Sequence, residues 1–359
     1  MYTSFEISNF RCFEKLKVSP LERVNLFTGL NGVGKTALLE ALFIPGTYDP
    51  SVVFTLGSIR GVEPLKAEPG AASERPWTSL FRGFDESQPI TLAGECTDGR
   101  RIEVRLSSAL SKDELRQLHY MVRTRKQDQH SAPSSLTPPL VLGLQYSRGD
   151  EVRRHYLLVG EGGSQVYPLP PAPPCPIRFL PALYRYDPKA EAELYGQLLL
   201  QGKQEAVLEA LRILQPKLGS LTVIPQGDRT MLYADVGEAR LVPLPLVSDG
   251  LLRIARLFLF IVYQSGGILL VDEVENGIHH SVMPKVWEAI GKAAERFNTQ
   301  VIATTHSREC IVAAHQAFSA MKGYAFRLHR LEEVHGEILD VTYNQETLSA
   351  AIEAGLEVR

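Results

Sequence analysis

The stretch from Arg23 to Phe43, RVNLFTGLNGVGKTALLEALF, constrains the fold more than any other part of the chain. It starts with the apolar run Val24 to Thr28, continues with the octapeptide GLNGVGKT at 29–36, and ends with leucines at helical spacing. The octapeptide matches the pattern G-x-x-x-x-G-K-[ST] at every position. The stretch therefore predicts a buried strand, a glycine-rich turn and a helix that begins near Lys35.

Each residue type in this octapeptide has a chemical reason. Glycines let successive backbone N–H groups approach phosphate oxygens, and the following helix presents its positive end to the same anion. The Lys35 ammonium is predicted to contact the β- and γ-phosphates of ATP, and the Thr36 hydroxyl to bind Mg²⁺. An ordinary glycine-rich turn is the alternative, which the flanking strand and helix disfavour. The predicted nucleotide-binding residues here are Asn31, Gly32, Val33, Gly34, Lys35 and Thr36.

A pair of carboxylates follows a second apolar run. In GILLVDE at 267–273, four apolar residues without alternation indicate a strand buried on both faces, as in a parallel sheet. Asp272 is predicted to hold Mg²⁺, directly or through water, and Glu273 to orient and deprotonate the water that attacks the γ-phosphate. Adjacent acids are weak evidence alone, but a phosphate-binding loop in the same chain makes them strong evidence.

A third apolar run, QVIATTHS at 300–307, ends in a histidine. Because it follows a strand of the same kind, His306 is predicted to contact the γ-phosphate or the attacking water. The predicted catalytic residues are thus Lys35, Glu273 and His306. His279 and His280 would suggest a metal, but no further ligands are spaced around them, so a structural role is predicted.

The segment NFRCF at 9–13 lies shortly before the octapeptide. Two interpretations remain open. Arg11 and its aromatic neighbours could contact the nucleotide, which places Arg11 among the predicted binding residues. Alternatively, Phe10 and Phe13 belong to the core of a hairpin and Arg11 is a solvated turn residue.

The chain divides into three predicted segments. Residues 1–45 and 177–359 carry the motifs above, and 46–176 is a β-rich insertion with a hairpin turn at Asp98-Gly99. Residues 45–76 are predicted to be a surface excursion. The formal net charge of −3 gives no overall nucleic-acid footprint, so DNA contact would need a local patch. The basic helix predicted at 111–126 is such a patch, although a solvated face is the favoured interpretation.

The cysteines, the start of the chain and its most apolar run indicate the cellular compartment. Four widely separated cysteines without C-x-x-C spacing argue against zinc and against a disulfide framework. The start of the chain shows no secretory leader, and the apolar run Leu251 to Tyr263 contains two arginines and is too short to span a bilayer. A cytoplasmic protein without membrane contact is expected, with this run as a buried helix.

The order of these motifs resembles the ABC-type ATPase head of RecF, of SMC-like proteins and of the overcoming-lysogenisation-defect (OLD) ATPases. More closely, LVSDGLLR at 246–253, DEVENGIHH at 272–280, THSREC at 305–310 and the ending EVR resemble the stand-alone AAA-type ATPases allied to the OLD group. The likeness covers 1–45 and about 177–359. It implies an α/β P-loop ATPase head with a mixed central sheet flanked by helices, an antiparallel β lobe and a β-rich insertion.

The resemblance assigns further residues. Ser248 to Gly250 stands where the family has its signature motif, so the Ser248 hydroxyl and the Gly250 N–H, at a helix N-terminus, would touch the γ-phosphate of the nucleotide held by another subunit. Val274 to His279 stands where the D-loop lies, at the dimer seam. The sequence SDG is a reduced form of Ser-Gly-Gly-Gln, and Gln145 is a Q-loop candidate by position only. OLD enzymes also carry a TOPRIM nuclease, which is expected here on a separate chain.

The sequence and its family resemblance leave three functions to be distinguished. The first is an ATPase that forms a nucleotide-dependent homodimer, hydrolyses ATP to ADP and phosphate, and controls a separately encoded TOPRIM-like nuclease or DNA in bacterial genome defence. The second is a RecF-like DNA-repair ATPase, which salt-sensitive duplex binding would favour. The third, a metabolic P-loop kinase, is disfavoured because the signature-like segment and His306 would have no role in it.

Overall fold

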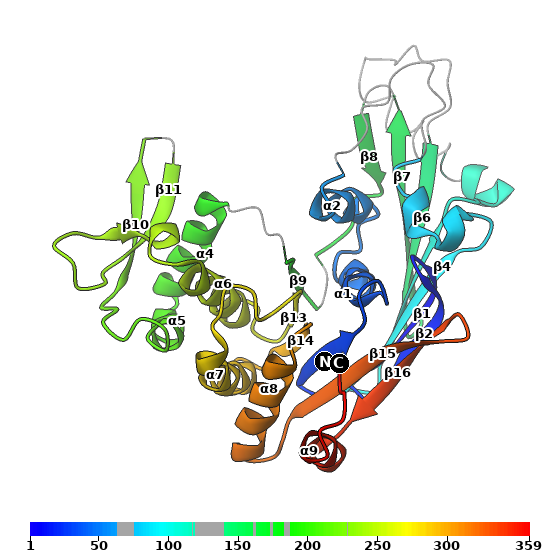
Figure 1. Ribbon diagram of the computed structural model, residues 1–359. Helices are drawn as coiled ribbons and strands as arrows, with labels where there is room; N and C mark the ends of the chain where they lie inside the picture. The colour runs from blue at the N-terminus through cyan, green and yellow to red at the C-terminus, as the bar shows by residue number, and fades with distance from the viewer. Residues whose placement is uncertain are drawn as a thin grey trace.

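The computed structural model describes residues 1–62, 75–116, 118, 140–160, 163–172, 175–182, 187–227 and 229–359. Within these residues the chain forms a six-stranded sheet, a seven-stranded sheet and a three-stranded sheet, with helices packed against the first (Figure 1). This arrangement confirms the predicted α/β class with a mixed central sheet and an antiparallel lobe. No helix of the described part is both long and apolar enough to cross a bilayer.

The central sheet positions the predicted site. Its order is β16-β15-β3-β14-β13-β9. Pairing is parallel from β9 through β13, β14 and β3 to β15, whereas β16 runs antiparallel to β15. The carboxyl ends of β3, β13 and β14 therefore lie at one edge, where the three motifs meet. The strands are β3 (Val24–Gly29), β9 (Ile177–Leu180), β13 (Ile268–Val271), β14 (Gln300–Thr304), β15 (Phe326–Val334) and β16 (Glu337–Tyr343).

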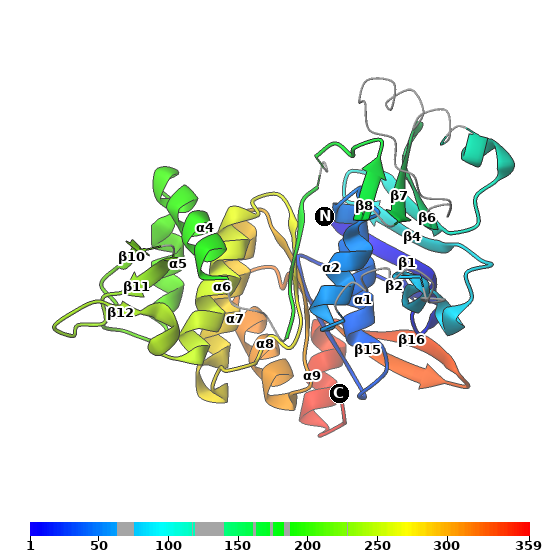
Figure 2. The same cartoon turned by 90° about the horizontal axis from the view of Figure 1, so that it is seen from above.

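Side chains alternate between two cores on the two faces of this sheet. On β13, Leu269 and Val271 pack with the helices α4 to α9, whereas Ile268 and Leu270 pack with α1, α2 and the antiparallel lobe. Figure 2 shows these groups on opposite sides of the central strands. The helices are α1 (Lys35–Phe43), α2 (Val52–Ile59), α4 (Pro188–Leu200), α5 (Gln204–Leu211), α6 (Asp249–Tyr263), α7 (Met283–Arg296), α8 (Arg308–Ala320) and α9 (Gln345–Glu353).

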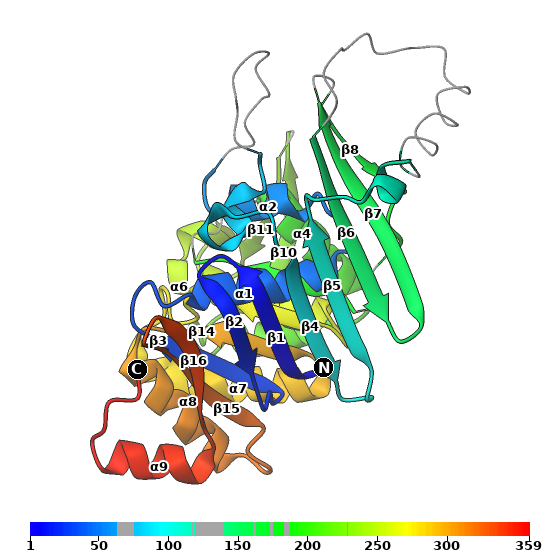
Figure 3. The same cartoon turned by 90° about the vertical axis from the view of Figure 1, so that its right-hand side faces the viewer.

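The antiparallel lobe is one continuous sheet in the order β2-β1-β4-β5-β6-β7-β8 (Figure 3). The hairpins expected at the start of the chain and around Asp98-Gly99 are both present. Because strands on both sides of residue 45 share this sheet, the division at 45 and 176 stays a prediction. The strands are β1 (Tyr2–Phe10), β2 (Phe13–Val18), β4 (Ile90–Cys96), β5 (Arg101–Ser107), β6 (Leu140–Arg148), β7 (Glu151–Gly160) and β8 (Gly163–Tyr167).

Smaller elements complete the described part. A three-stranded sheet stands beside α4 at the far left of Figure 1. It consists of β10 (Leu221–Gln226), β11 (Arg229–Ala234) and β12 (Val242–Pro243). Short 3₁₀ turns occur at η1 (Ile44–Gly46), η2 (Thr78–Leu80), η3 (Arg82–Phe84), η4 (Leu244–Leu246) and η5 (His280–Val282).

The prediction of a surface excursion over 45–76 is wrong in part. Residues 52–59 form α2, whose Val52, Val53 and Leu56 are buried in the same apolar cluster as α1. Tertiary burial stabilises a helix here although the local pattern is rich in glycine and proline. Residues 63–74 lie outside the described part, as does most of the basic helix predicted at 111–126, of which 112–116 are helical.

Candidate nucleotide site

The phosphate-loop backbone has a shape that requires glycine. Gly29, Gly32 and Gly34 have φ angles of 136°, 83° and 103°, in the region that other L-residues rarely adopt. At two of these glycines an added Cβ would also clash with neighbouring atoms. A Cβ on Gly29 would lie 2.4 Å from the Leu331 oxygen, and one on Gly34 would lie 2.7 Å from Cζ of the buried Phe13. The sequence therefore makes a turn that only small residues can close against β15 and the N-terminal hairpin.

This packing predicts different costs for two alanine substitutions. Gly34→Ala combines an unfavourable φ, worth about 1 to 2 kcal/mol, with overpacking against Phe13, worth about 1 to 3 kcal/mol. Gly32→Ala is the matched control, because its Cβ would meet nothing within 4 Å and only the conformational cost applies. Urea unfolding should show Gly34→Ala as the less stable of the two. Equal stability would contradict the contact with the hairpin.

Lys35 lies inside this loop and is only 5% exposed. Its Nζ donates to the carbonyl oxygens of Gly29 at 2.7 Å and Leu30 at 3.0 Å. Burial lowers the pKa of Lys35, and the charges of Asp272, Glu273 and Glu275 partly offset this. The ammonium is thus held at the loop backbone, beside the N-terminus of α1.

The two residues predicted to bind Mg²⁺ are in contact. Thr36 Oγ1 on α1 donates to Asp272 Oδ2 at 2.9 Å, and Asp272 Oδ1 accepts from Thr304 Oγ1 at 2.6 Å. A hydroxyl and a carboxylate are oxygen ligands of the kind Mg²⁺ prefers, and Mg²⁺ commonly completes its shell with phosphate oxygens and water. Among the described residues no group of three or more His, Cys, Asp or Glu side chains could hold a metal ion. The donor set therefore fits Mg²⁺ bound together with a nucleotide.

Glu273 and His306 emerge side by side from β13 and β14. His306 Nε2 lies 3.7 Å from Glu273 Oε1, and the two side chains are 40% and 36% exposed. Asn276 Nδ2 donates to Glu273 Oε2 at 2.7 Å. The Glu273 backbone has φ 48° and donates its N–H to Thr304 Oγ1 at 2.9 Å. The structure thus brings the predicted base Glu273 and the predicted γ-phosphate contact His306 together at an accessible edge of the sheet.

Two threonines and Glu275 belong to this edge, although sequence reasoning assigned no role to the threonines. Glu275 Oε1 accepts from Thr305 Oγ1 at 2.8 Å and from the His306 backbone N–H at 2.9 Å. Thr304 Oγ1 donates to the Asp272 carboxylate and accepts from the Glu273 backbone N–H. The signal was the Thr-Thr pair directly before His306: hydroxyls at a parallel strand end face the acids on the neighbouring strand.

Ser248 and Gly250 lie on the other side of the central sheet from α1. Ser248 is exposed and caps α6, with Oγ accepting from the Leu251 N–H at 3.1 Å. Gly250 is buried, and a Cβ there would lie 2.4 Å from the Gly277 oxygen. The helix α6 covers the face opposite α1, and no hydrogen bond of the described residues joins Ser248 to the phosphate loop.

Arg11 is held in an ion pair with α1. Its Nε donates to Glu40 Oε2 at 3.1 Å, and the other oxygen of the same buried carboxylate binds Arg60 at 2.6 Å. Phe10 and Phe13 are buried, as the hairpin-core interpretation expected, whereas the turn residue Arg11 is 19% exposed at its side chain and is paired with Glu40. A contact between Arg11 and the nucleotide stays a prediction.

Other candidates lie away from the phosphate loop. Gln145 stands on β6 of the antiparallel lobe, where its side-chain oxygen accepts from Arg154 at 3.0 Å. His279 Nδ1 lies 2.8 Å from Ser281 Oγ, and its ring is 4.2 Å from that of His280. These contacts show no arrangement that serves the phosphate loop, and the Q-loop assignment stays a prediction.

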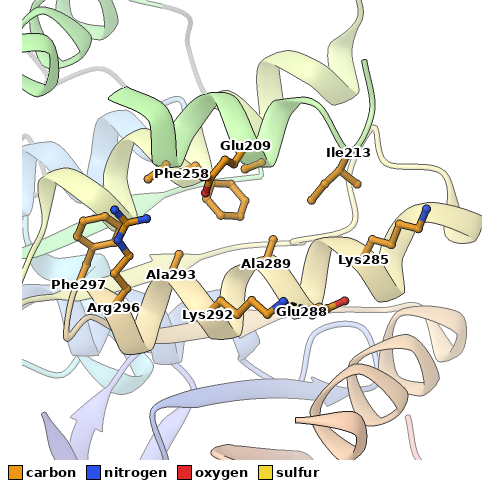
Figure 4. Close-up of a pocket in the computed structure, with 12 residues that line it drawn as sticks. Glu209, Ile213, Phe258, Lys285, Glu288, Ala289, Lys292, Ala293, Arg296 and Phe297 are labelled. Atoms are coloured by element: carbon orange, nitrogen blue, oxygen red, sulfur yellow. Dashed lines mark hydrogen bonds and ion pairs between the residues drawn. The ribbon is translucent and has the colours of Figure 1, made fainter. Parts of the chain in front are cut away.

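An open hollow of about 370 Å³ lies between α5 and α7 (Figure 4). Phe258 and several alanines form its floor, and charged side chains of α7 form one rim. It contains none of the predicted site residues and is separate from the phosphate loop. The lining residues are Ala206, Glu209, Ala210, Ile213, Phe258, Lys285, Glu288, Ala289, Lys292, Ala293, Arg296 and Phe297.

Arg253 is a site residue that sequence reasoning missed. It is 7% exposed and donates to the backbone oxygens of Asp272 and Glu273. A signal was present, since an arginine inside the apolar run 251–263 must find buried partners.

Comparison with known proteins is consistent with this geometry. An ATP/GTP phosphatase of Helicobacter pylori is 21% identical over 384 aligned positions, which cover 97% of each chain. The DNA replication and repair protein RecF of Idiomarina loihiensis is 44% identical over 43 residues, 12% of each chain. An SMC head, solved bound to the C-winged helix domain of ScpA, superposes with a TM-score of 0.50 at 12% identity, over 98% of this chain and 99% of that one.

The SMC-head likeness extends over nearly the whole length and shows the fold, namely a mixed-sheet P-loop ATPase head. A family model described as "AAA domain, putative AbiEii toxin, Type IV TA system" matches residues 24–311. That span contains the phosphate loop, both acids and His306. The chain therefore belongs to this family of AAA-domain P-loop ATPases.

Proposed function

We propose that this protein binds Mg-ATP and hydrolyses it to ADP and phosphate. The observation that carries the proposal is the contact of Thr36 with Asp272 beside the exposed pair Glu273 and His306. The groups proposed to bind phosphate, to bind the metal and to activate water thus lie at one sheet edge, which supports the proposal. The Helicobacter pylori relative that spans 97% of the chain is named an ATP/GTP phosphatase, which supports the same reaction class.

The residues have distinct roles in this proposal. Backbone N–H groups of 31–34 and the Lys35 ammonium bind the phosphates, while Thr36 and Asp272 hold Mg²⁺, which neutralises phosphate charge when bound. Glu273 accepts a proton from water as the water oxygen bonds the γ-phosphorus and the bond to the ADP oxygen breaks. His306 contacts the γ-phosphate. Phosphate release without any added acceptor would distinguish this hydrolase from a kinase.

We further propose that two copies share each nucleotide. Ser248 is exposed at the N-terminus of α6, on the opposite side of the central sheet from the Lys35 of its own chain. A second copy could bring its Ser248 and the first turn of its α6 to the γ-phosphate, where a helix N-terminus binds anions well. The dimer would close when ATP binds and open after hydrolysis.

Mixing two inactive variants tests this shared site. Ser248→Arg should bind ATP through its own Lys35 but block the γ-phosphate position of its partner, whereas Lys35→Ala should lose its own site only. Random pairing makes about half of the dimers mixed, each with one intact site, so roughly a quarter of wild-type turnover is the ceiling. Ser319→Arg, at an exposed serine of α8, is the control and should stay active alone. If crosslinking shows mixed dimers yet no phosphate is released, either both sites must act together or the shared site is wrong. In crosslinked ATP-bound dimers of Glu273→Gln, a Ser248 that does not lie beside the nucleotide of the other copy would show that the shared site is wrong.

We propose that the nucleotide cycle controls a separately encoded TOPRIM-like nuclease in bacterial genome defence. The motif resemblance to the OLD group supports this role, whereas the family description names an AbiEii toxin and no nuclease. Affinity capture with Glu273→Gln tests it. A TOPRIM-containing nuclease should be recovered with ATP and lost with ADP. Recovery of the same nuclease with both nucleotides would contradict control by the nucleotide.

A second candidate is a RecF-like role on DNA, which the 43-residue likeness to RecF favours. Binding to duplex DNA would then depend strongly on salt. A protein that makes 6 to 10 phosphate contacts loses about 10³- to 10⁵-fold in affinity between 50 and 200 mM salt. Fluorescence anisotropy with a labelled duplex, with and without ATP, measures this loss. The absence of binding at low salt would exclude this candidate.

A further inference from the structure

Arg253 is a buried cation with no carboxylate partner among the described ion pairs. It stands on α6, the helix that Ser248 caps. Its Nη1 donates to the Pro181 oxygen at 3.2 Å, and its Nη2 donates to the oxygens of Asp272 at 2.5 Å and Glu273 at 3.2 Å. Pro181 follows β9, so one guanidinium joins the ends of β9 and β13.

The environment of Arg253 makes these bonds important. Burial and the neighbouring Arg256 lower the pKa of Arg253 to about 10, and the charges of Asp272, Glu275 and Glu273 partly offset this. A buried charge needs polar partners, and hydrogen bonds to charged groups contribute about 1.5 to 3 kcal/mol each. Arg253 is therefore held firmly against the turn that carries both acids.

The backbone of Glu273 explains what Arg253 does there. Its φ of 48° is uncommon for a residue with a side chain and persists only when the surroundings impose it. The two carbonyl groups that Arg253 binds flank the Glu273 Cα. In an extended strand successive carbonyls point in opposite directions, so binding both to one nitrogen favours the turned conformation. That conformation sets the direction of the Glu273 side chain.

A second contact joins α6 to the same turn. Gly250, in the first turn of α6, packs so closely on Gly277 that a Cβ would lie 2.4 Å from the Gly277 oxygen. Asn276, which directly precedes Gly277 in the chain, donates to Glu273 Oε2 at 2.7 Å. A shift of α6 would therefore reach Glu273 both through Arg253 and through residues 276–277.

We propose that Arg253 is a positioning residue that holds the Glu273 backbone and couples the N-terminus of α6 to the hydrolytic base. The proposal rests on the proposed function and extends it. Contact of Ser248 with the nucleotide of a second copy would move α6, and Arg253 would transmit the movement to Glu273. Hydrolysis would then be fast only after the two copies have closed.

A double-mutant cycle tests this coupling. Arg253→Gln should lower the turnover number about 10- to 100-fold, as the loss of an outer-shell partner typically does, and leave the Mg-ATP dissociation constant within about threefold. In a Glu273→Gln background the same substitution should cost nothing further, because its effect passes through Glu273. Arg253→Lys should restore part of the activity, since an ammonium can bond some of the same carbonyls.

Glu191→Gln is the matched control. Glu191 is a buried residue on α4 that pairs with Arg256 on α6 at 2.7 Å, so the amide weakens an ion pair that holds the same helix. The Glu191→Gln substitution perturbs α6 through Arg256 and makes no contact with the turn at Glu273. Its melting temperature should fall while its turnover number stays within about twofold of wild type. A turnover loss in this control equal to that of Arg253→Gln would show general loosening of α6 and overturn the proposal.

The other possible results of the cycle also test the proposal. Full activity of Arg253→Gln, or losses that multiply with those of Glu273→Gln, would show that Arg253 does not act through Glu273. If Arg253→Gln does not fold, the same cycle with Arg253→Lys gives the answer. Retained activity of Glu273→Gln alone would instead contradict the proposed base. Failure of the proposed function is thereby distinguished from failure of this inference.

Discussion

Lys35→Ala is expected to abolish ATP binding and turnover while the protein stays folded. The ammonium is buried at the loop backbone, where it would face the β- and γ-phosphates. Charge-assisted hydrogen bonds contribute about 1.5 to 3 kcal/mol each, so losing two of them lowers affinity by at least about a hundredfold. Isothermal titration calorimetry with Mg-ATP and a phosphate-release assay measure the two losses.

Folding controls separate this effect from instability. Lys35→Ala removes two hydrogen bonds to backbone oxygens, but it also removes an ammonium whose pKa burial lowers, so the variant should stay folded, and urea unfolding checks this. Lys292→Ala removes an exposed lysine of α7 that pairs with Glu288, and it should bind ATP normally. Unchanged affinity in Lys35→Ala would remove the phosphate-loop assignment.

Glu273→Gln is expected to separate nucleotide binding from hydrolysis. A positioned general base contributes about 10²- to 10⁴-fold, or roughly 3 to 5 kcal/mol of barrier, and the amide cannot accept the proton from water. Binding of Mg-ATP should persist, because Thr36, Asp272 and Lys35 are unchanged. Single-turnover kinetics measure the loss. Light scattering with ATP should also show this variant accumulating as the closed dimer.

Glu275→Gln is the control for that experiment. One oxygen of Glu275 accepts hydrogen bonds from both Thr305 and the His306 backbone, so an amide oxygen at this position can keep both. The loss of turnover in Glu275→Gln should therefore be much smaller than that in Glu273→Gln. If Glu275→Gln were inactive and Glu273→Gln active, the base would have been placed on the wrong carboxylate.

Local patterns were sufficient for the elements that carry the site. The strand before the phosphate loop, the helix from Lys35 and the doubly buried strand before Asp272 all occur as expected. Each depends on short-range chemistry, namely glycine at positive φ, helical spacing of leucines, or an apolar run that needs burial on both faces. Ser248 caps a helix, as the family resemblance implied.

Local patterns were insufficient wherever the partner lies far away in the chain. No spacing in the sequence indicates that Arg11 pairs with Glu40, or that Arg253 donates to backbone oxygens at the ends of two strands. The helix α2 was missed for the same reason, because its stability comes from the cluster it joins and not from its own composition. The last two strands and α9 were not assigned, although β15 borders the strand that carries the phosphate loop.

The chemical groups that this protein offers to a nucleotide can be read from local patterns, since a phosphate loop, an acidic pair and a histidine at strand ends each occupy a short stretch. How those groups meet depends on the tertiary fold. The fold brings Thr36 into contact with Asp272, 236 positions away, and packs α6, which Ser248 caps, on the face of the sheet opposite α1. Strand order and the packing of distant side chains depend on burial across the whole chain, which no short window of sequence records.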